Sequence, residues 1–88
     1  MERLYHKAIN QGATDFGISK RKGKKYYVIY KGTKIHFGAD GMSDYTLHKD
    51  KERRARYRAR ASKITNKLGE YTYLDKTSPN YWSYHLLW

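Results

Sequence analysis

Two short runs of β-branched and aromatic residues form the clearest hydropathy pattern in the chain. Residues 26–30 read YYVIY and residues 33–37 read TKIHF, with Lys31-Gly32 between them. Strands of this composition around a short glycine-containing turn are typical of a β-hairpin. The first strand is apolar on both faces, so we expect a covering layer on each side or one face left for a partner. Its expected core side chains are Tyr26, Val28 and Tyr30, and the opposite face, with Tyr27 and Ile29, is a candidate contact for the C-terminal segment.

A second element is dominated by charged residues, and we expect a helix from Lys51 to about Asn66. Asp50 fits the N-cap, and Glu52 lies in the first turn, where the helix dipole favours an acid. The apolar positions form only a narrow stripe, composed of Tyr57, Ile64 and Leu68. Much of the remaining circumference is covered by Arg53, Arg54, Arg56, Arg58 and Arg60.

The segments around these elements complete a predicted fold of class α+β. Residues 1–19 carry a weak helical pattern at Leu4 and Ala8 and are interpreted as an N-terminal arm. Between the hairpin and the basic helix, Gly38 to Gly41 is expected to be a turn, followed by a short capped turn around Tyr45. Ser78-Pro79 predicts the start of a C-terminal helix. We therefore expect one small domain over residues 20–88, in which a β-hairpin is followed by a basic helix and a short aromatic C-terminal helix.

Length and composition narrow the function classes. With 88 residues the chain allows one small core, and such chains often rely on a partner for part of their stability. The absence of cysteine excludes disulfides, thiolate zinc sites and cysteine nucleophiles, and it fits a cytosolic or intravirion setting. No apolar run reaches about 18 residues, so no membrane span is expected. The mixed, charged N-terminus does not resemble a signal peptide.

The charge distribution indicates a polyanionic partner. The net charge is +11, and all of it lies between residues 20 and 63, because acids and bases balance elsewhere. Guanidinium groups bind phosphate oxygens as bidentate forks, and a row of them can follow a nucleic-acid backbone. An acidic protein surface or a simply solvated helix face are the alternatives. The expected nucleic-acid contacts, with DNA favoured over RNA, are the five helix arginines and a basic loop containing Lys20, Arg21, Lys22, Lys24 and Lys25.

The aromatic tail has two interpretations. As a docking element, its side chains would fill the pocket of a partner protein. Alternatively, it folds back and completes the small core of its own chain. The predicted docking residues are Tyr81, Trp82, Tyr84, Leu86, Leu87 and Trp88. The numerous tyrosines could stack on bases, but packing is the favoured role in so small a domain.

Metal binding and catalysis find little support in the sequence. His36, His48 and Asp50 could be drawn together as a metal site, but their spacing does not place them on one helical face. A Mg²⁺-dependent nuclease requires clustered carboxylates, whereas Asp40 and Asp44 lie loosely spaced in a loop. No nucleophile–base pattern, phosphate-binding glycine loop or zinc-protease motif is present. We expect no enzyme, no cofactor, no metal and no small-molecule substrate.

Residues 24–63 and the tail resemble a small family found in large DNA viruses and some phages. The matching core segments are His36-Phe37-Gly38, Asp44-Tyr45-Thr46, His48, Asp50, Arg54 to Tyr57 and Arg60, and the tail match is Trp82 to Trp88. Ala61 stands where that family commonly has histidine, and Met42 where it commonly has an aromatic residue. The resemblance implies a viral origin and a small virion or genome-associated protein. We therefore expect a virion protein that binds the packaged genome without sequence specificity, or alternatively a minor capsid or cement protein that bridges coat subunits through its tail and basic helix.

Overall fold

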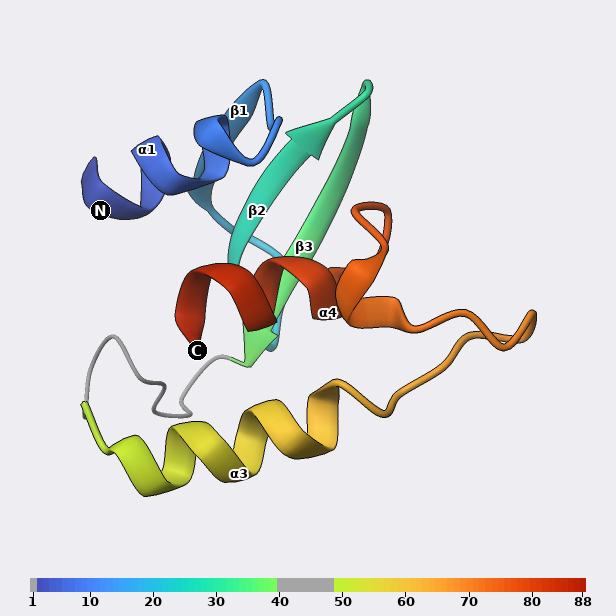
Figure 1. Cartoon of the computed structure of the whole chain (residues 1–88). Coiled ribbons are helices and arrows are strands. Elements are labelled where there is room, and N and C mark those ends of the chain that lie inside the picture. Colours follow the sequence, from blue (N-terminus) through green and yellow to red (C-terminus); the bar gives the residue numbers. More distant parts are fainter. Residues whose placement is uncertain (1, 40–48) are drawn as a thin grey trace.

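The computed structural model describes residues 2–39 and 49–88, and it confirms the predicted α+β class (Figure 1). Three strands form one antiparallel sheet, and short helical elements surround it. In chain order the elements are α1 (Glu2–Asn10), β1 (Asp15–Ile18), β2 (Lys24–Tyr30), β3 (Thr33–Ala39), α3 (Lys51–Ala61), η1 (Thr72–Leu74), α4 (Pro79–Trp82) and η2 (Ser83–Leu87).

The predicted hairpin is formed by β2 and β3. Its two-residue turn has positive φ at both central positions, 49° at Lys31 and 78° at Gly32. This is the pattern of a type I′ turn, whose twist matches that of the flanking strands. In the resulting register Val28 pairs with Ile35 and Tyr27 pairs with His36. The hairpin prediction from the alternating apolar pattern is therefore confirmed.

The N-terminal residues belong to the fold, although the sequence suggested an arm. The helix α1 buries Leu4 and Ala8, which lie four residues apart on one helix face. The strand β1, which the sequence analysis did not anticipate, pairs with β2 and places Phe16 beside Val28. Gly17 has a steric role in β1, because a Cβ atom there would lie 2.7 Å from the Tyr27 hydroxyl oxygen.

One face of the sheet carries the hydrophobic core. Buried side chains from α1, all three strands, α4 and η2 form a single cluster. Its central members from the C-terminal segment are Trp82, Leu86 and Leu87, and Trp82 is fully buried. Tyr30 packs against Trp82, with ring centroids 6.0 Å apart. The C-terminal segment therefore covers the Val28 face, and the expected contact between that segment and Tyr27 and Ile29 is wrong.

The structure favours the interpretation in which the aromatic tail completes its own core. Of the six predicted docking residues, Tyr81, Trp82, Leu86 and Leu87 are buried, while Tyr84 and Trp88 are half-buried. A side chain inside this core cannot enter a partner's pocket unless the domain unpacks. The predicted helix start is confirmed, because the Ser78 hydroxyl accepts a hydrogen bond from the Asn80 amide and Pro79 is the first helical residue.

The basic helix begins where the sequence predicts and ends earlier. The Asp50 carboxylate accepts hydrogen bonds from the amides of Glu52 (3.0 Å) and Arg53 (3.3 Å). The helix ends at Ala61 instead of continuing to Asn66. Beyond it, the backbone amide and the hydroxyl of Thr72 both donate to the Ile64 carbonyl, so non-local hydrogen bonds replace helical ones. The predicted apolar stripe therefore does not form, and Leu68 is 83% exposed.

Two further expectations concern the connection between β3 and α3. The predicted turn at Gly38 to Gly41 runs into residues 40–48, and the predicted capped turn around Tyr45 lies wholly outside the described residues.

Over the described ranges 2–39 and 49–88, no helix is long and apolar enough to cross a membrane.

Candidate nucleic-acid interface

The helix α3 is attached to the rest of the molecule by one face of arginine and aromatic side chains. Arg54 Nε donates a 2.6 Å hydrogen bond to the carbonyl oxygen of Trp88. Tyr57 stacks on the Trp88 indole, with centroids 4.3 Å apart and an interplanar angle of 11°. The Arg58 guanidinium lies 4.5 Å from the Tyr84 ring centroid. These positions share one face because they are three or four residues apart. Two of the five predicted phosphate contacts, Arg54 and Arg58, thus hold the helix in place.

Two polar side chains of the C-terminal segment also reach α3. Ser83 Oγ accepts from the Gly38 backbone amide at 3.2 Å, and the Ser83 hydroxyl lies near the Tyr57 side chain. Its hydroxyl therefore links β3 to η2 beside α3. Burial raises the pKa of Tyr57, although the nearby Ser83 hydroxyl acts in the opposite direction. Asn80 Nδ2 donates to the Ala61 carbonyl (3.1 Å) and to Thr72 Oγ1 (2.9 Å), which fixes the end of the helix.

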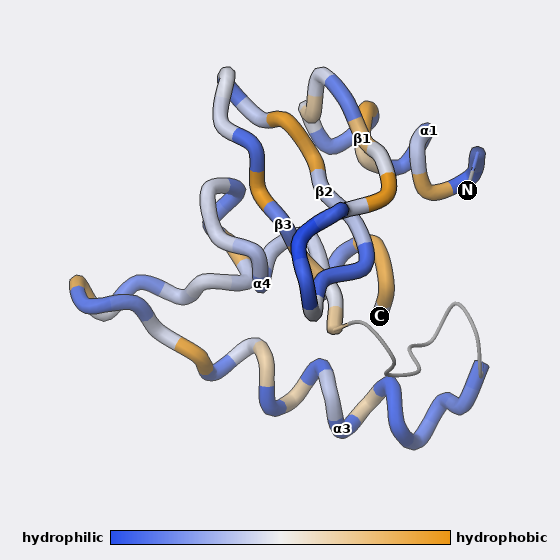
Figure 2. Tube along the Cα trace, turned by 180° about the vertical axis from the view of Figure 1, so that it is seen from behind, coloured by the Kyte–Doolittle hydropathy of each residue, from blue (hydrophilic) through white to orange (hydrophobic). Residues whose placement is uncertain are grey.

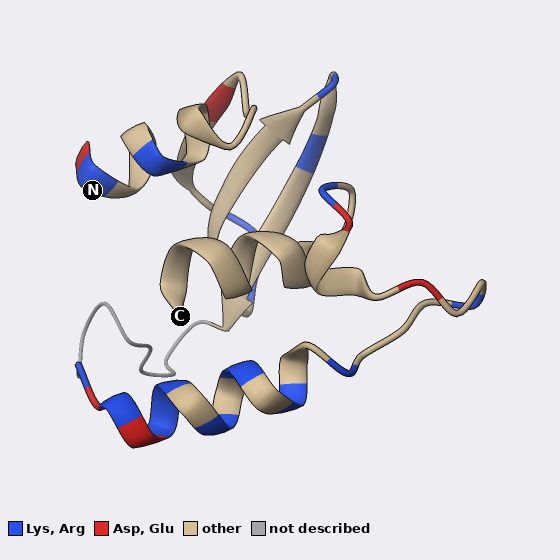
Figure 3. Cartoon of the chain, in the orientation of Figure 1, with Lys and Arg blue, Asp and Glu red and all other residues tan. Residues whose placement is uncertain are grey.

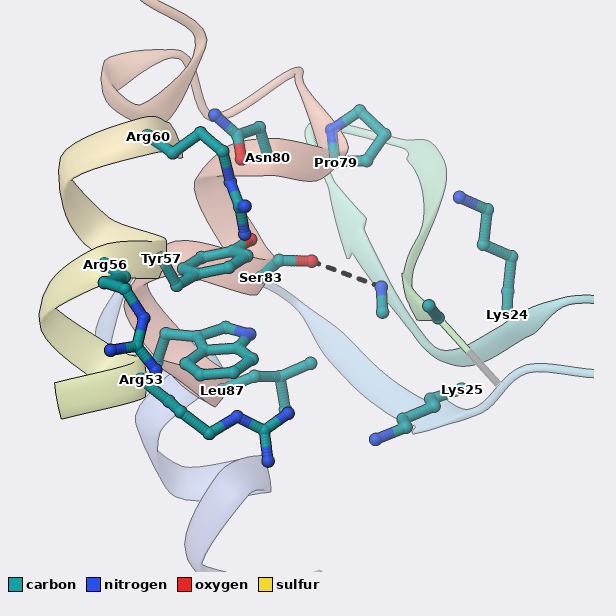
Figure 4. Close-up of a pocket in the computed structure, with 13 residues that line it drawn as sticks. Lys24, Lys25, Arg53, Arg56, Tyr57, Arg60, Pro79, Asn80, Ser83 and Leu87 are labelled. Atoms are coloured by element: carbon teal, nitrogen blue, oxygen red, sulfur yellow. Dashed lines mark hydrogen bonds between the residues drawn. The ribbon is translucent and has the colours of Figure 1, made fainter. Parts of the chain in front are cut away.

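The other arginines of α3 point into a groove between the helix, the end of the sheet and the C-terminal segment (Figure 4). The groove has a volume of about 510 Å³. Arg53, Arg56 and Arg60 line it from α3, and all three are exposed. Lys24 and Lys25, at the start of β2, line it from the opposite side. The two basic segments that the sequence singled out, almost thirty residues apart, thus meet across one cavity.

The groove combines a positive rim with an aromatic and polar floor. Tyr57, Trp88 and Leu87 supply apolar surface, and Pro79, Asn80, Ser83, Gly38 and Ala39 complete the described lining. No aspartate or glutamate is among these lining residues. Glu52 approaches Arg56 at 4.0 Å from outside the groove, and both side chains are largely solvated, so this pair neutralises little of the charge. Figure 3 shows lysine and arginine positions along the whole length of α3.

The remaining predicted loop residues, Lys20, Arg21 and Lys22, do not line the groove. They are exposed in the connection between β1 and β2. Their backbone is shaped by a hydrogen bond from the Lys24 amide to the Arg21 carbonyl and by another from the Ser19 amide to the Lys25 carbonyl. Of the ten predicted nucleic-acid contacts, the groove brings together Lys24, Lys25, Arg53, Arg56 and Arg60.

Sequence reasoning missed the contribution of Ser83, Asn80 and Pro79 to the groove. Ser78-Pro79 signalled a helix start, but no local signal shows that this helix lies beside α3. Among the described residues, no three histidine, aspartate or glutamate side chains are placed to hold a metal ion. His48, Asp40 and Asp44, considered above as ligands, lie outside the described residues.

Fold and site together define a small α+β protein whose basic groove is closed on one side by its own C-terminal segment. The chain belongs to a family described as a family of unknown function (DUF5754), whose model matches residues 14–61. The matched part runs from the start of β1 to the end of α3, and it includes all five groove cations. The comparisons with curated proteins and with solved structures each found no match.

Proposed function

We propose that this protein binds nucleic acid through phosphate contacts in the basic groove, without reading sequence. In keeping with the resemblance of its motifs to a family of DNA viruses and phages, we further propose that it is a virion protein and that its ligand is the packaged DNA genome. The observation that carries the binding proposal is the convergence of Lys24 and Lys25 with Arg53, Arg56 and Arg60 on one groove.

The spacing of the groove arginines suits a phosphodiester backbone. Arg53 and Arg60 are seven residues apart, which corresponds to about 10 Å along a helix axis. One strand of duplex DNA presents a phosphate about every 3.4 Å of axis, so this length of helix faces about three phosphates. Arginine remains charged at all relevant pH values and binds phosphate through paired N–H groups. The contacts expected from this groove are with the backbone, which favours binding that does not depend on sequence.

The test is DNA binding measured by fluorescence anisotropy over a range of salt concentrations. A variant with Arg53→Gln, Arg56→Gln and Arg60→Gln should bind more weakly, and its salt dependence should be less steep. Each lost phosphate contact removes about 0.9 from the slope of log affinity against log salt, so the slope should fall by up to about 2.7.

A matched control removes the same charge elsewhere. Arg3, Lys7 and Lys67 are exposed and do not line the groove. Replacing these three by glutamine should leave most of the salt slope intact. Equal losses in both variants would mean that net charge alone drives binding, and the groove would lose its proposed role.

A role as a minor capsid or cement protein is a second candidate, supported by a different surface. The segment that runs from the end of α3 through η1 presents apolar side chains to solvent, with Leu68 83% and Leu74 63% exposed. Exposed apolar side chains on an ordered protrusion suit contact with a coat protein. Replacing Leu68 and Leu74 by serine should then reduce incorporation into particles while DNA binding persists. Normal incorporation of this variant would remove the support for a capsid contact at this surface.

A further inference from the structure

The sheet has a second face that none of the described helices covers (Figure 2). The core and the C-terminal segment lie on the side of Val28 and Phe37. The opposite side carries Tyr27 from β2 and Lys34 and His36 from β3, because alternate residues of a strand point to opposite faces. This face is bordered by the basic loop between β1 and β2.

A chain of hydrogen bonds fixes the orientation of His36 on this face. The Arg21 backbone amide donates to Ser19 Oγ at 3.1 Å, and Ser19 Oγ lies 2.7 Å from His36 Nδ1. The Ser19 oxygen has two lone pairs, so it can accept from the Arg21 amide and from a protonated Nδ1 at the same time. When the imidazole carries both protons, Nδ1–H donates to Ser19 and Nε2–H is a donor for a ligand.

Cationic and aromatic groups flank this donor. Lys34 precedes His36 by two residues on the same side of β3, and its Nζ lies 4.2 Å from the Tyr27 ring centroid. Tyr27 is the register partner of His36, with ring centroids 6.3 Å apart. The Tyr27 ring lies directly against Gly17 of β1, where any Cβ atom would collide with it. These contacts preorganise the groups before a ligand arrives.

The electrostatic environment favours an anion. Within the described residues, no carboxylate forms an ion pair with Arg21, Lys34 or His36. Burial, Arg21, Lys34 and Lys24 all lower the pKa of His36. A cluster of like charges around an imidazole is unfavourable by itself, and an anion bound among these groups would relieve the repulsion.

We propose that Ser19, Arg21, Lys34 and His36 form a phosphate-binding site on the uncovered sheet face, separate from the groove. In this site His36 Nε2 donates to a phosphate oxygen, and Arg21 and Lys34 supply charge. The assignment of a nucleic-acid backbone phosphate as its ligand rests on the proposed function. Two phosphate sites on one small domain allow it to contact a second strand or a second duplex.

The site should bind phosphate more tightly as the pH falls, because a bound anion stabilises protonated His36. The groups that contact the imidazole or act on its charge are Ser19 and Arg21 from the loop, Lys24 and Tyr27 from β2, and Lys34 from its own strand. Lys24 also lines the groove. All the charged members of this set are basic. Acidification therefore adds a positive charge to the site without neutralising an acid within it.

The first experiment follows the ring nuclei of His36 by NMR while inorganic phosphate is added. We expect saturable shifts at His36 and at the Arg21 amide, and an upward movement of the His36 titration midpoint with phosphate. The same shifts should persist in the Arg53→Gln, Arg56→Gln, Arg60→Gln variant, because the two sites are separate. Shifts confined to groove residues, or shifts at His36 that vanish in this variant, would overturn the proposal.

The second experiment separates the sources of phosphate. Lys34→Gln and His36→Phe should each weaken phosphate binding at the sheet face at least threefold, while Lys31→Gln in the adjacent turn should not. Anisotropy with a duplex oligonucleotide should show a loss of similar size for the first two variants only. If inorganic phosphate binds and oligonucleotide affinity is unchanged, the nucleic-acid assignment is overturned and the site takes free phosphate. If even the unmodified chain does not bind the oligonucleotide, the proposed function is wrong. The shifts of His36 with inorganic phosphate test the sheet-face site separately.

Discussion

The hydroxyl of Ser83 is the point at which the end of β3 and the C-terminal segment are joined beside the basic helix. Replacing Ser83 by alanine removes the acceptor for the Gly38 amide, which is part-buried. A protein hydrogen bond contributes about 0.5–1.5 kcal/mol net, and a partner left unpaired in a half-buried site adds to the loss. We therefore expect Ser83→Ala to destabilise the fold by about 2 kcal/mol.

The assay is urea and thermal unfolding followed by the fluorescence of Trp82 and Trp88. For a domain of this size 1 kcal/mol corresponds to about 4–8 °C, so the midpoint should fall by roughly 10 °C. Tyr57→Phe keeps the stack on Trp88 and leaves the hydrogen bond between Gly38 and Ser83 in place, so it should lose less than Ser83→Ala, at most about 1 kcal/mol.

A matched control is Ser62→Ala. The Ser62 hydroxyl donates only to the Ala59 carbonyl of its own helix, in an exposed position. Its loss should change the free energy of unfolding by less than about 0.5 kcal/mol. Equal losses of stability in Ser83→Ala and Ser62→Ala would refute a structural role for the hydrogen bond between Gly38 and Ser83.

Three other predictions concern the core, the sheet and the pH dependence of stability. Leu86→Ala, at a buried position, should destabilise by about 2–5 kcal/mol, whereas Leu68→Ala at the exposed loop should stay within about 0.5 kcal/mol in the same urea titration. Gly17→Ala should lower the free energy of unfolding by about 1–3 kcal/mol, because the added Cβ atom must displace the Tyr27 ring. The displacement should change the ring resonances of Tyr27 in NMR spectra, and unchanged resonances would contradict the close packing. Burial lowers the pKa of His85 below its ordinary value of 6.5, so the unfolded chain binds this proton more readily than the folded protein does. The free energy of unfolding should therefore fall as the pH drops through and below 6.5. His85→Gln should flatten that part of the pH–stability curve, and an unaltered curve would show that His85 is not responsible.

Features set by local chemistry could be predicted from the sequence. Asp50 and Ser78 cap their helices through hydrogen bonds to amides two or three residues away. The Lys31-Gly32 turn likewise needs only its own two dihedral angles. Such interactions are complete within a few residues, so the pattern that encodes them is visible in the chain.

Features set by distant contacts could not be predicted. The end of α3 depends on Thr72 capturing the Ile64 carbonyl. Nothing in the sequence around Gly17 shows that its role is to admit the Tyr27 ring against β1. For the site, the sequence shows the basic residues, but it does not show which of them line the groove and which of them hold α3 in place. Arg54 and Arg58 hold the helix because they contact Trp88 and Tyr84 of the C-terminal segment. No periodicity in the run of arginines indicates which of them face that segment.

The central position of the C-terminal segment has a consequence for the order of folding during synthesis. Trp82, Leu86 and Leu87 complete a core that otherwise consists of α1 and the three strands. The sheet can pair early, but its apolar face is covered only in part, by α1, until these residues leave the ribosome. The basic helix also waits, because its docking partners Tyr84 and Trp88 emerge after it. A nascent chain stalled before Trp82 should therefore be sensitive to protease, and resistance should appear in a single step once residues 82–88 are free.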